Sequence, residues 1–503
     1  MNSKINYEFE NIFAGLILSK QTQEPIYKWN GRSRESVALL LWHDAATPSL
    51  MRQNDYLDRK LETAAANETA SLQQALLARQ LDYLLARSEF YQEKCRGAGV
   101  RRKDFRKLRD LARFPFTTKE ELRASQAAHP PLGRHIAADW RDVIRVHSST
   151  GTSGKPSFVG ITRRDAKVWT RLTARSFYTQ GLRKTDVVVH AAGLTLFVAG
   201  LTSKDAIESL GAVFVPLGTG ASEKALAMIP LLGVNAMHCT PSYAAYFADF
   251  VRREAGIDPR DLGLKKLFCG GEPGAGIPAI RGKLEQDWGA RVTEGLGNAD
   301  MAPIIFSECA EQSGMHFNGP DAVVVEIIDP QTGENLPHEA GVTGELVYTS
   351  LQRECVPLLR FRTRDRVQVL GTSCACGRTG FKLRCVGRTD DMLIVLGVNV
   401  FPSAIKDVVS SFYPATTGEI QIVLDKPGPG VEPPLKVIAE CCGEPAASAA
   451  LRLAVERKIK AILSVSASVE LVRAGTLPRY EMKGQLVRKA YQNAEVTAGS
   501  LRP

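Results

Sequence analysis

The chain has 503 residues, of which 44% are hydrophobic and 23% charged, as is typical of a globular protein with two or three domains. It contains no run of about 18 apolar residues, which excludes a transmembrane helix. Glu8 and Glu10 precede the short apolar patch at the N-terminus, where a secretory signal would be basic. The net charge is +10, but acids interrupt the densest basic run, at 101–110, as on a solvated helix face. We therefore expect a cytoplasmic protein that binds neither membranes nor nucleic acid, with its ten cysteines as thiols or metal ligands.

The first part of the chain divides into an extension and a large domain. Residues 1–75 are mixed in composition and carry no clear motif, so we expect an N-terminal extension of unknown role. Apolar residues then recur at helical spacing over 71–125. From about residue 143, short apolar runs such as DVVVHAA alternate with helical stretches such as PSYAAYFADF. This alternation predicts a multi-layer α/β domain over 76–387.

The second part of the chain is predicted to be richer in strands. Segments such as GELVYTS, between about 322 and 386, predict a β-rich subdomain that continues the large domain. Past this point, residues 388–503 predict a small α+β domain, with the proline-rich stretch at 426–434 as a loop inside it. The fold class expected is therefore α/β, with a large first domain and a small C-terminal domain.

A loop dense in hydroxyls, glycines and one lysine precedes the first α/β units. It reads SSTGTSGK from Ser148 to Lys155. Free backbone N–H groups, hydroxyls and a lysine are ligands for phosphate. The loop is not a Walker A motif, because Gly151 and Gly154 are too close and Pro156 follows the lysine. The alternative is a flexible Ser/Thr/Gly linker.

Further motifs follow in chain order. FCGGEPGAG at 268–276 is a glycine turn after a predicted strand, which lets a flat ligand approach the backbone. In PLLRFRTRDRVQVL, Asp365 could bind ribose hydroxyls, or pair with Arg362 or Arg364. GRTDDMLIVLGVNVFPSAI begins the predicted small domain, and TLPRYEMKGQLVRK lies near the C-terminus. Its Lys483 alone would be read as a surface lysine.

Together and in this order, these motifs resemble the adenylate-forming superfamily of acyl-CoA synthetases, adenylation domains and luciferases. The amino-acid sequences of these motifs are most similar to those of the phenylacetate–CoA ligase branch. Two further segments, CTPSYA at 239–244 and FPFTTKEELR at 114–123, add to the similarity. The resemblance covers about 75–490.

The resemblance implies a reaction in two halves. A carboxylate attacks the α-phosphorus of MgATP, giving acyl-AMP and pyrophosphate, and the mobile C-terminal domain then rotates so that the CoA thiolate displaces AMP. Lys483 would bridge the carboxylate and the α-phosphate, where negative charge gathers in the transition state. Asp390 would be the hinge. Asp365 would bind the ribose hydroxyls, with Arg388 nearby. The remaining nucleotide-binding residues would be Ser148, Ser149, Thr150, Gly151, Thr152, Ser153, Gly154 and Lys155 at the departing phosphates, and Gly271, Glu272 and Pro273 at the adenine.

One motif departs from the family pattern. The family usually has Tyr-Gly-x-Ser/Thr-Glu after the GGEP strand and helix, and the best match here is Leu296-Gly297-Asn298-Ala299-Asp300. Aliphatic contact then replaces stacking on adenine and a hydroxyl is lost, with Asn298 beside the nucleotide. Asp300 keeps a carboxylate that suits Mg²⁺. A register shifted by one residue is the alternative.

A metal site is expected from cysteines and a histidine. Cys309 and His316 occur in SECAEQSGMHF, and Cys374 and Cys376 in GTSCACGRTG. Three cysteines and one histidine make a closed tetrahedral zinc site of the structural type. The alternative is a chance pair in a loop. The resemblance favours zinc, because members of the branch often carry Cys and His at these places.

The acid itself is not identified by the sequence, although the branch favours aromatic acids such as phenylacetate, benzoate-like or larger aryl acids. Leu194, Phe197 and Tyr243 are apolar or aromatic and suit an aryl ring, or belong to the core. The small Gly297 and Ala299 would leave room for a bulky ring. We expect an AMP-forming aryl-acid CoA ligase that uses ATP, Mg²⁺ and coenzyme A and holds structural Zn²⁺. A homodimer is left open.

Two alternatives to the ligase remain open. One is an adenylating enzyme with another acceptor, either a carrier-protein thiol or a deazaflavin. The other is a degenerate relative that binds nucleotide without turnover, which Leu296 and Ala299 suggest and the intact Lys155, Asp365 and Lys483 oppose.

Overall fold

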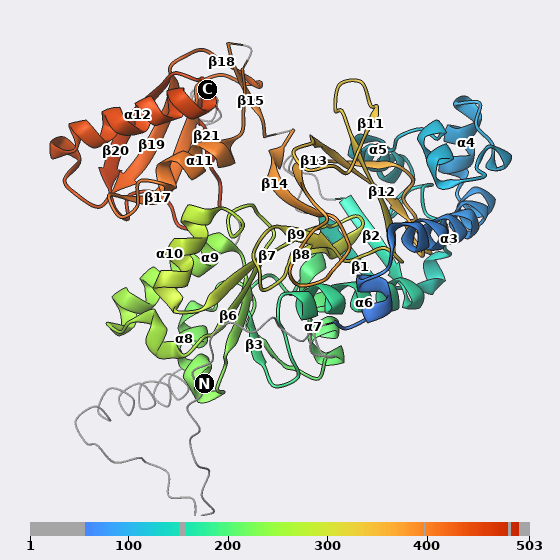
Figure 1. Cartoon of the computed structure of the whole chain (residues 1–503), viewed down its shortest axis with the longest axis horizontal. Coiled ribbons are helices and arrows are strands. Elements are labelled where there is room, and N and C mark those ends of the chain that lie inside the picture. The colour runs from blue at the N-terminus through green and yellow to red at the C-terminus, as the bar shows by residue number, and fades with distance from the viewer. Residues whose placement is uncertain (1–55, 150–156, 390, 397, 481–483, 492–503) are drawn as a thin grey trace, which may run out of the picture. The chain divides into compact units, whose positions relative to one another are not determined.

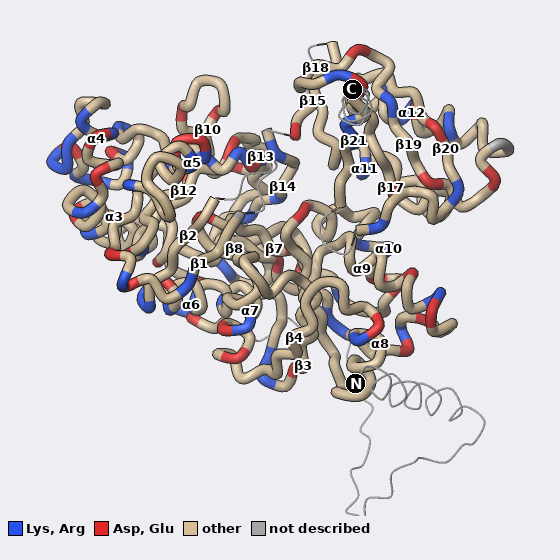
Figure 2. Tube along the Cα trace, turned by 180° about the vertical axis from the view of Figure 1, so that it is seen from behind, with Lys and Arg blue, Asp and Glu red and all other residues tan. Residues whose placement is uncertain are grey.

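The computed structural model describes residues 56–149, 157–389, 391–396, 398–480 and 484–491 (Figure 1). The chain divides into two compact units, residues 1–54 and 55–503, and all described residues belong to the second unit. Lys and Arg alternate with Asp and Glu along the described trace, as the scattered charges of the sequence predict (Figure 2). No helix in these described ranges is both long and apolar enough to cross a bilayer.

The described chain begins with helices, as the spacing of apolar residues over 71–125 predicts. The longest of them, α3, buries Leu77, Leu81 and Leu84, which pack with Leu351 and Leu359 of the large domain. The cap of α5 is a capping box, in which Thr118 accepts from the Glu121 amide and the Glu121 carboxylate accepts from the Thr118 amide. The α-helices are α2 (Arg59–Glu62), α3 (Ala66–Arg87), α4 (Glu89–Gly97) and α5 (Lys119–Ala128), with 3₁₀ turns at Arg102–Asp104, Leu108–Arg113 and Trp140–Asp142.

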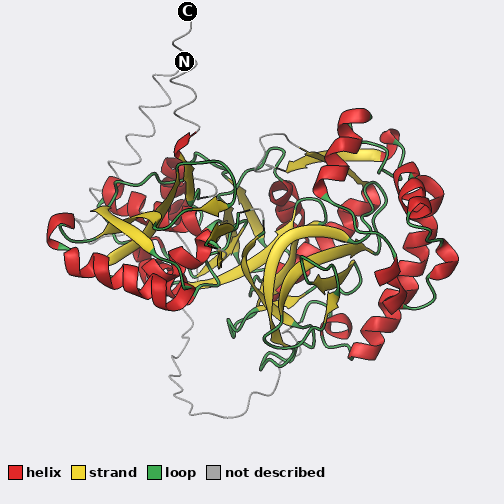
Figure 3. Ribbon diagram, turned by 90° about the horizontal axis from the view of Figure 1, so that it is seen from above, coloured by secondary structure: helices red, strands yellow, loops and turns green. Residues whose placement is uncertain are grey.

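A twelve-stranded sheet forms the middle of the large domain, with helices outside it (Figures 1 and 3). Five strands, in the order β7-β6-β5-β3-β4, are parallel and joined by helices, as the alternating pattern predicts. They are β3 (Val187–His190), β4 (Val213–Pro216), β5 (Ala236–Cys239), β6 (Lys266–Gly270) and β7 (Arg291–Asn298). The helices are α6 (Arg163–Thr179), α7 (Val198–Ser209), α8 (Ser222–Leu231), α9 (Pro241–Phe250) and α10 (Pro278–Trp288), with short turns at Val251–Ala255 and Pro259–Leu262.

The other half of this sheet is antiparallel and begins where β8 pairs with β7. The β-rich region therefore continues the same sheet rather than forming one of its own. Its strands are β8 (Ala302–Glu308), β9 (Met315–Phe317), β10 (Val323–Ile328), β11 (Asn335–Leu336), β12 (Thr343–Ser350), β13 (Phe361–Gly371) and β14 (Lys382–Arg388). A separate two-stranded hairpin consists of β1 (Val143–Ser149) and β2 (Ser157–Thr162).

The C-terminal part has its own sheets and its own core, as expected of a small α+β domain. Its larger sheet has the order β20-β19-β17-β21, and a smaller one has the order β16-β15-β18. The elements are β15 (Leu393–Val395), β16 (Val398–Val400), α11 (Pro402–Ser410), β17 (Thr416–Leu424), β18 (Gly430–Val431), β19 (Leu435–Cys441), α12 (Ala449–Leu463), β20 (Ala467–Arg473) and β21 (Val487–Lys489), with a 3₁₀ turn at Pro445–Ala447. The proline-rich stretch is a loop that contains only the short strand β18.

Candidate active site

Motif residues lie at the ends of strands in the parallel half of the twelve-stranded sheet and within two strands of its antiparallel half. Gly271 directly follows β6, and Asn298 ends β7. Asp365 in β13 and Arg388 in β14 face each other as a cross-strand pair. Ligands of open α/β sheets bind beyond the carboxyl ends of parallel strands, where the strand order changes. Gly271 and Asn298 therefore lie at the end of the parallel strands where folds of this type bind ligands.

Asp365 pairs with Arg388 and not with the arginines that flank it in sequence. The distance from Arg388 Nη1 to Asp365 Oδ1 is 2.8 Å, and Asp365 is only 6% exposed. Side chains alternate along β13, so Asp365 lies on the buried face and the even-numbered arginines on the other. Arg362 pairs with Glu345 and Arg364 with Glu120. The structure therefore brings together the carboxylate and the arginine that the sequence assigns to the ribose.

The expected phosphate loop is described only at its start. Ser148 donates its amide to the carbonyl of Leu196 at 2.9 Å, so the start of the loop lies beside the segment that contains Leu194 and Phe197. Ser149 pairs with Ser157 across the hairpin of β1 and β2. The side chain of Ser149 and the predicted phosphate ligands Thr150, Gly151, Thr152, Ser153, Gly154 and Lys155 lie outside the described residues.

The glycine turn after β6 is fixed by side chains beneath it. Gly271 has a φ of +86°, which favours glycine. The Glu294 carboxylate accepts the Gly274 amide at 3.1 Å, and a Cβ at Gly276 would lie 2.2 Å from Glu294 Oε2. Arg281 donates to the carbonyl of Ala275 at 2.7 Å. The backbone of the predicted adenine-binding turn is thus held in place by hydrogen bonds to the side chains of Glu294 and Arg281.

Glu294 is a residue that sequence reasoning missed. Burial, followed by the neighbouring Glu308 carboxylate, raises its pKa to about 7. Glu308 in turn accepts the Glu294 amide at 2.9 Å and pairs with Arg281 at 2.6 Å. The available signal was an acid at the centre of the short strand RVTEGLGN, because a charged residue in a buried strand needs a partner.

Glu272, the acid of the turn, contacts backbone groups of two other segments. Its Oε1 accepts the amide of Ser242 at the start of α9, at 2.8 Å. Its Oε2 accepts the amide of Gly484 at 2.7 Å. Burial raises the pKa of Glu272, and hydrogen bonds from Ser242 and Gly484 oppose that shift. Beside this contact, a pocket of about 290 Å³ separates α9 and α10 from α11 and Arg479.

The altered motif between β7 and β8 has a different arrangement from the one expected. The Asn298 side chain accepts the Asp300 amide at 2.9 Å, within its own turn. Both oxygens of Asp300 contact Lys119 Nζ, at 2.5 and 2.6 Å, and both side chains are largely buried. A magnesium ion bound by Asp300 would compete with this lysine, so the magnesium role of Asp300 stays a prediction.

The expected acid-binding residues differ in their surroundings. Leu194 and Phe197 are half-buried. Tyr243 is 1% exposed and stacks on Phe247, so its ring belongs to the core. A Cβ at Gly297 would lie 1.8 Å from the carbonyl oxygen of Pro303, so this glycine is required by the close backbone of the hairpin and opens no space. Ala299 is half-buried against the core of the large domain.

The predicted metal ligands form a cluster. One ligand atom each from Cys309, His316, Cys374 and Cys376 lies within 4.8 Å of the others. The Sγ atoms of Cys309 and Cys374 are 3.7 Å apart, and Cys376 Sγ is 3.4 Å from His316 Nε2. Zn–S bonds of about 2.3 Å in a tetrahedron give edges of about 3.8 Å. His316 Nδ1 faces the Gly380 carbonyl at 3.4 Å, which leaves Nε2 toward the cluster.

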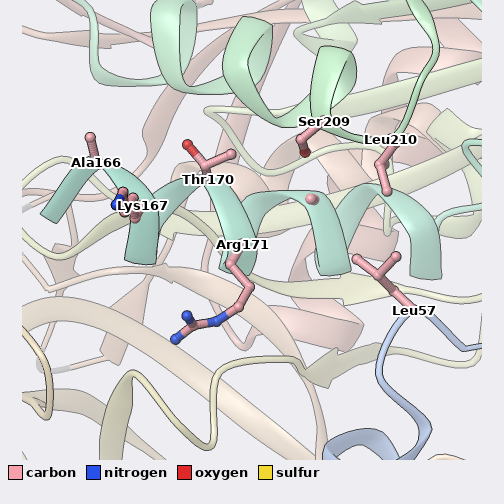
Figure 4. Close-up of a pocket in the computed structure, with 8 residues that line it drawn as sticks. Leu57, Ala166, Lys167, Thr170, Arg171, Ser209 and Leu210 are labelled. Carbon is pink, nitrogen blue, oxygen red and sulfur yellow. The ribbon is translucent and has the colours of Figure 1, made fainter. Parts of the chain in front are cut away.

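The described part of the N-terminal extension packs against this cluster. The Tyr56 hydroxyl donates to the carbonyl of Cys376 at 2.7 Å, and Arg378 pairs with the buried Glu62 at 2.7 Å. Leu57 of the same segment lines an open pocket on α6 with Lys167, Thr170, Arg171 and Leu210 (Figure 4). None of the predicted nucleotide or acid ligands that the structure describes lines that pocket.

The predicted catalytic lysine and hinge, Lys483 and Asp390, lie outside the described residues, but their neighbours are described. Thr389 donates its amide to the carbonyl of Arg364 at 2.9 Å. Arg479 forms a two-pronged ion pair with Glu440, at 2.9 and 2.6 Å. The segments that precede these two residues are therefore held by specific contacts.

Known proteins are similar to this chain over most of its length. Residues 397–489 match the family model of the AMP-binding enzyme C-terminal domain. The phenylacetate-coenzyme A ligase of Thermus thermophilus is 36% identical, covering 84% of this chain and 96% of the relative. Those of Pseudomonas putida and Escherichia coli are 35% and 32% identical, covering 84% and 86% of this chain and 94% and 97% of the relatives.

Solved structures of one CoA ligase match most of the chain. 2-Hydroxyisobutyryl-CoA ligase in the postadenylation state, with an acyl-AMP bound, has a TM-score of 0.81 at 28% identity, over 89% of this chain and 96% of that one. The same ligase in the thioesterification state, with CoA bound, has a TM-score of 0.65 at 29% identity, over 91% of this chain and 97% of that one.

Proposed function

Since the chain belongs to the phenylacetate–coenzyme A ligase branch of the adenylate-forming enzymes, we propose that it activates an aryl carboxylic acid with ATP and transfers the acyl group to coenzyme A. The observation that carries this proposal is the buried cross-strand pair of Asp365 and Arg388, and the glycine turn at Gly271 beyond the end of β6 supports it. A buried acceptor suits ribose hydroxyls, and a glycine turn lets a flat adenine ring approach the backbone.

The first half-reaction forms the acyl-adenylate. A carboxylate oxygen of the acid attacks the α-phosphorus, and the bond to pyrophosphate breaks with its electron pair leaving on pyrophosphate. Lys155 and the hydroxyls from Ser148 onward would hold the departing phosphates, and Lys483 would neutralise charge on the acid and the α-phosphate. Magnesium, when bound, would neutralise phosphate charge, and Asp300 is the carboxylate proposed to hold it.

The second half-reaction moves the acyl group to a thiol. The CoA thiolate attacks the acyl carbon, and the bond to AMP breaks with its electron pair leaving on AMP. The same pocket can serve both halves if the domain of residues 388–503 turns about Asp390 between them. The pocket between α9, α10 and α11 supports such a movable boundary.

The acid is proposed to be aromatic. The three relatives compared above are named for phenylacetate, and Leu194 and Phe197 offer half-buried apolar surface beside the phosphate loop. The structural neighbour named for 2-hydroxyisobutyryl-CoA acts on an aliphatic acid, so both acid classes belong in the test.

A structural zinc ion is proposed at Cys309, His316, Cys374 and Cys376. The spacing of the ligand atoms supports a tetrahedral site with all four positions filled by protein. Such an ion would stabilise the turn between β13 and β14 and take no part in the reaction.

The test is pyrophosphate release with MgATP against aromatic and aliphatic acids, each with and without CoA. Release with aryl acids, together with CoA consumed to a thioester, is the expected result. Release without CoA consumption would point to a carrier-protein thiol or a deazaflavin as acceptor. ATP binding without release for any acid would favour the degenerate relative. Lys483→Ala should abolish release, and Lys489→Ala, at an exposed lysine of β21, should not.

A further inference from the structure

We propose that Glu272 is a positioning residue for the first half-reaction, because its carboxylate joins the glycine turn of the large domain to the backbone that directly follows Lys483. This proposal rests on the proposed function. It assigns to Glu272 a task other than contact with the adenine.

The contact uses both oxygens of one carboxylate. Oε1 accepts the Ser242 amide at 2.8 Å, and Oε2 accepts the Gly484 amide at 2.7 Å. Hydrogen bonds to an ionised acceptor are about twice as strong as those between neutral groups. Ser242 lies in the first turn of α9, where the helix dipole favours a negative charge. The large domain thus holds the carboxylate in place before Gly484 reaches it.

The packing around Gly484 shows the same close approach independently. A Cβ at this position would lie 2.9 Å from Ser242 Oγ and 3.6 Å from Glu272 Oε2. Contacts under 3.0 Å are rarely tolerated without a shift of one partner. A glycine after Lys483 therefore lets the backbone of the small domain reach the turn of the large one.

A second carboxylate holds the segment before Lys483. Glu440 in β19 is fully buried, binds Arg479 with both oxygens, and accepts the Leu477 amide at 2.7 Å. Glu440 and Arg479 both belong to residues 388–503, so their contact survives any rotation of that domain. The bond from Gly484 to Glu272 crosses between the domains, so a rotation must break it.

The two anchors therefore have different consequences for the two half-reactions. A contact that exists in only one arrangement of the domains favours that arrangement. Loss of Glu272 should slow formation of the acyl-adenylate, when Lys483 must stay at the α-phosphate. It should leave transfer from the adenylate to CoA unchanged.

The experiment measures the two halves separately in the full-length protein, with phenylacetate as the probe. Exchange of pyrophosphate into ATP reports the first half, and thioester formation from phenylacetyl-adenylate and CoA without ATP reports the second. Glu272→Ala should lower exchange about 10- to 100-fold and change transfer by less than about twofold. Glu272→Gln keeps the size of the side chain but turns an amide donor toward one N–H, so it should lie between.

Glu432→Gln is the matched control, since it removes a charge from a side chain of the small domain that is 86% exposed. It should change neither half. Equal losses in both halves for Glu272→Ala, or no loss in either, would overturn the proposal. No exchange by the wild-type protein with any acid would instead count against the proposed function.

Hydrogen exchange of the peptide that contains Gly484 tests the contact without turnover. Exchange should be faster in Glu272→Ala than in the wild type, and unchanged in Glu432→Gln. Equal exchange in all three proteins would refute the contact. Gly484→Ala should also slow the first half, because the new Cβ would lie 2.9 Å from Ser242 Oγ and push the two segments apart.

Discussion

The two halves of the twelve-stranded sheet contribute to the site in different ways. The parallel half offers backbone to the candidate site, because strands such as β5 are buried throughout and only the turns at their ends are open to a ligand. The antiparallel half contributes side chains, because the residues of β13 alternate between a buried and a half-exposed face. Asp365 is a charge on the buried face of β13, held there by Arg388. The glycine turn is held by a hydrogen bond to the Glu294 side chain, whereas Asp365 is held by Arg388 on the neighbouring strand.

The largest effect is expected at the Cys/His cluster, which belongs to the antiparallel half. Removing a structural zinc removes folding free energy, so Cys376→Ser or a strong chelator should lower the melting temperature by roughly 10 °C or more. Calorimetry together with metal analysis measures this. Cys442→Ser, at an exposed cysteine outside the cluster, should have no effect. An unchanged melting temperature in Cys376→Ser would show that the cluster does not stabilise the antiparallel half of the sheet.

Lys119→Met tests the stability of the turn between β7 and β8, where the parallel and antiparallel halves of the sheet meet. This change leaves the buried Asp300 without its cation, which should cost about 3–5 kcal/mol of the free energy of unfolding. Urea unfolding measures the loss, and Mg²⁺ should restore part of it if Asp300 is a magnesium ligand. Lys204→Met, in an exposed pair with Glu208, should be nearly neutral. No recovery with Mg²⁺ would exclude Asp300 as a ligand.

The pH dependence of the free energy of unfolding tests how Glu294 supports the glycine turn. Burial raises its pKa from 4.5 to about 7, so the folded state binds this proton more tightly than the unfolded state. The stability it contributes is complete below about pH 4.5 and is lost as the pH rises through about 7. The rise of the pKa from 4.5 to about 7 corresponds to a loss of at most about 3.5 kcal/mol, at about 1.4 kcal/mol per pKa unit.

Glu294→Gln removes this titration and should flatten the stability profile between pH 5 and pH 8, measured by urea unfolding. The charged and titratable groups facing Glu294 are Glu308, Arg281, Cys269 and Cys385. Equal slopes in the two proteins would show that Glu294 does not titrate in this range.

Asp365→Asn tests the antiparallel half of the sheet, which contributes side chains to the candidate site. The amide keeps the shape but loses the charge toward Arg388 and the acceptor for a second hydroxyl, so kcat/KM for ATP should fall about 10- to 30-fold. Steady-state kinetics at saturating acid measures it. Arg364→Gln, on the other face of β13, should leave kcat/KM unchanged. Equal losses of kcat/KM in both variants would show that the face of β13 on which a side chain lies does not determine its effect on the reaction.

Features that depend on neighbours in sequence could be predicted from the sequence. The alternation of apolar runs indicated the α/β fold, and the Cys-x-Cys spacing indicated the cluster. Asp365 and Arg388 were assigned to one site by resemblance, and the structure places them together. These features are local, or repeat a pattern of known spacing.

The remaining features depend on partners far away in the chain. Lys119 and Asp300 are 181 residues apart, and Glu272 and Gly484 are 212 apart. No periodicity links such pairs, so the ion pair at the expected magnesium ligand and the contact that follows the predicted catalytic lysine were missed. Glu294 was missed for the same reason, because its task appears only when the turn at Gly274 lies over it.

Gly484 meets Glu272 through its backbone amide alone, and this affects what genetics can detect. A saturation scan of the gene should find intolerance at Glu272 and at Gly484, where a new Cβ would lie 2.9 Å from Ser242 Oγ. Ser242 should tolerate part of its substitutions, because all of them except proline keep the amide donor while they lose the hydroxyl that also faces Glu272. Covariation between paired side chains would not reveal the contact of Gly484, because glycine has no side chain to vary.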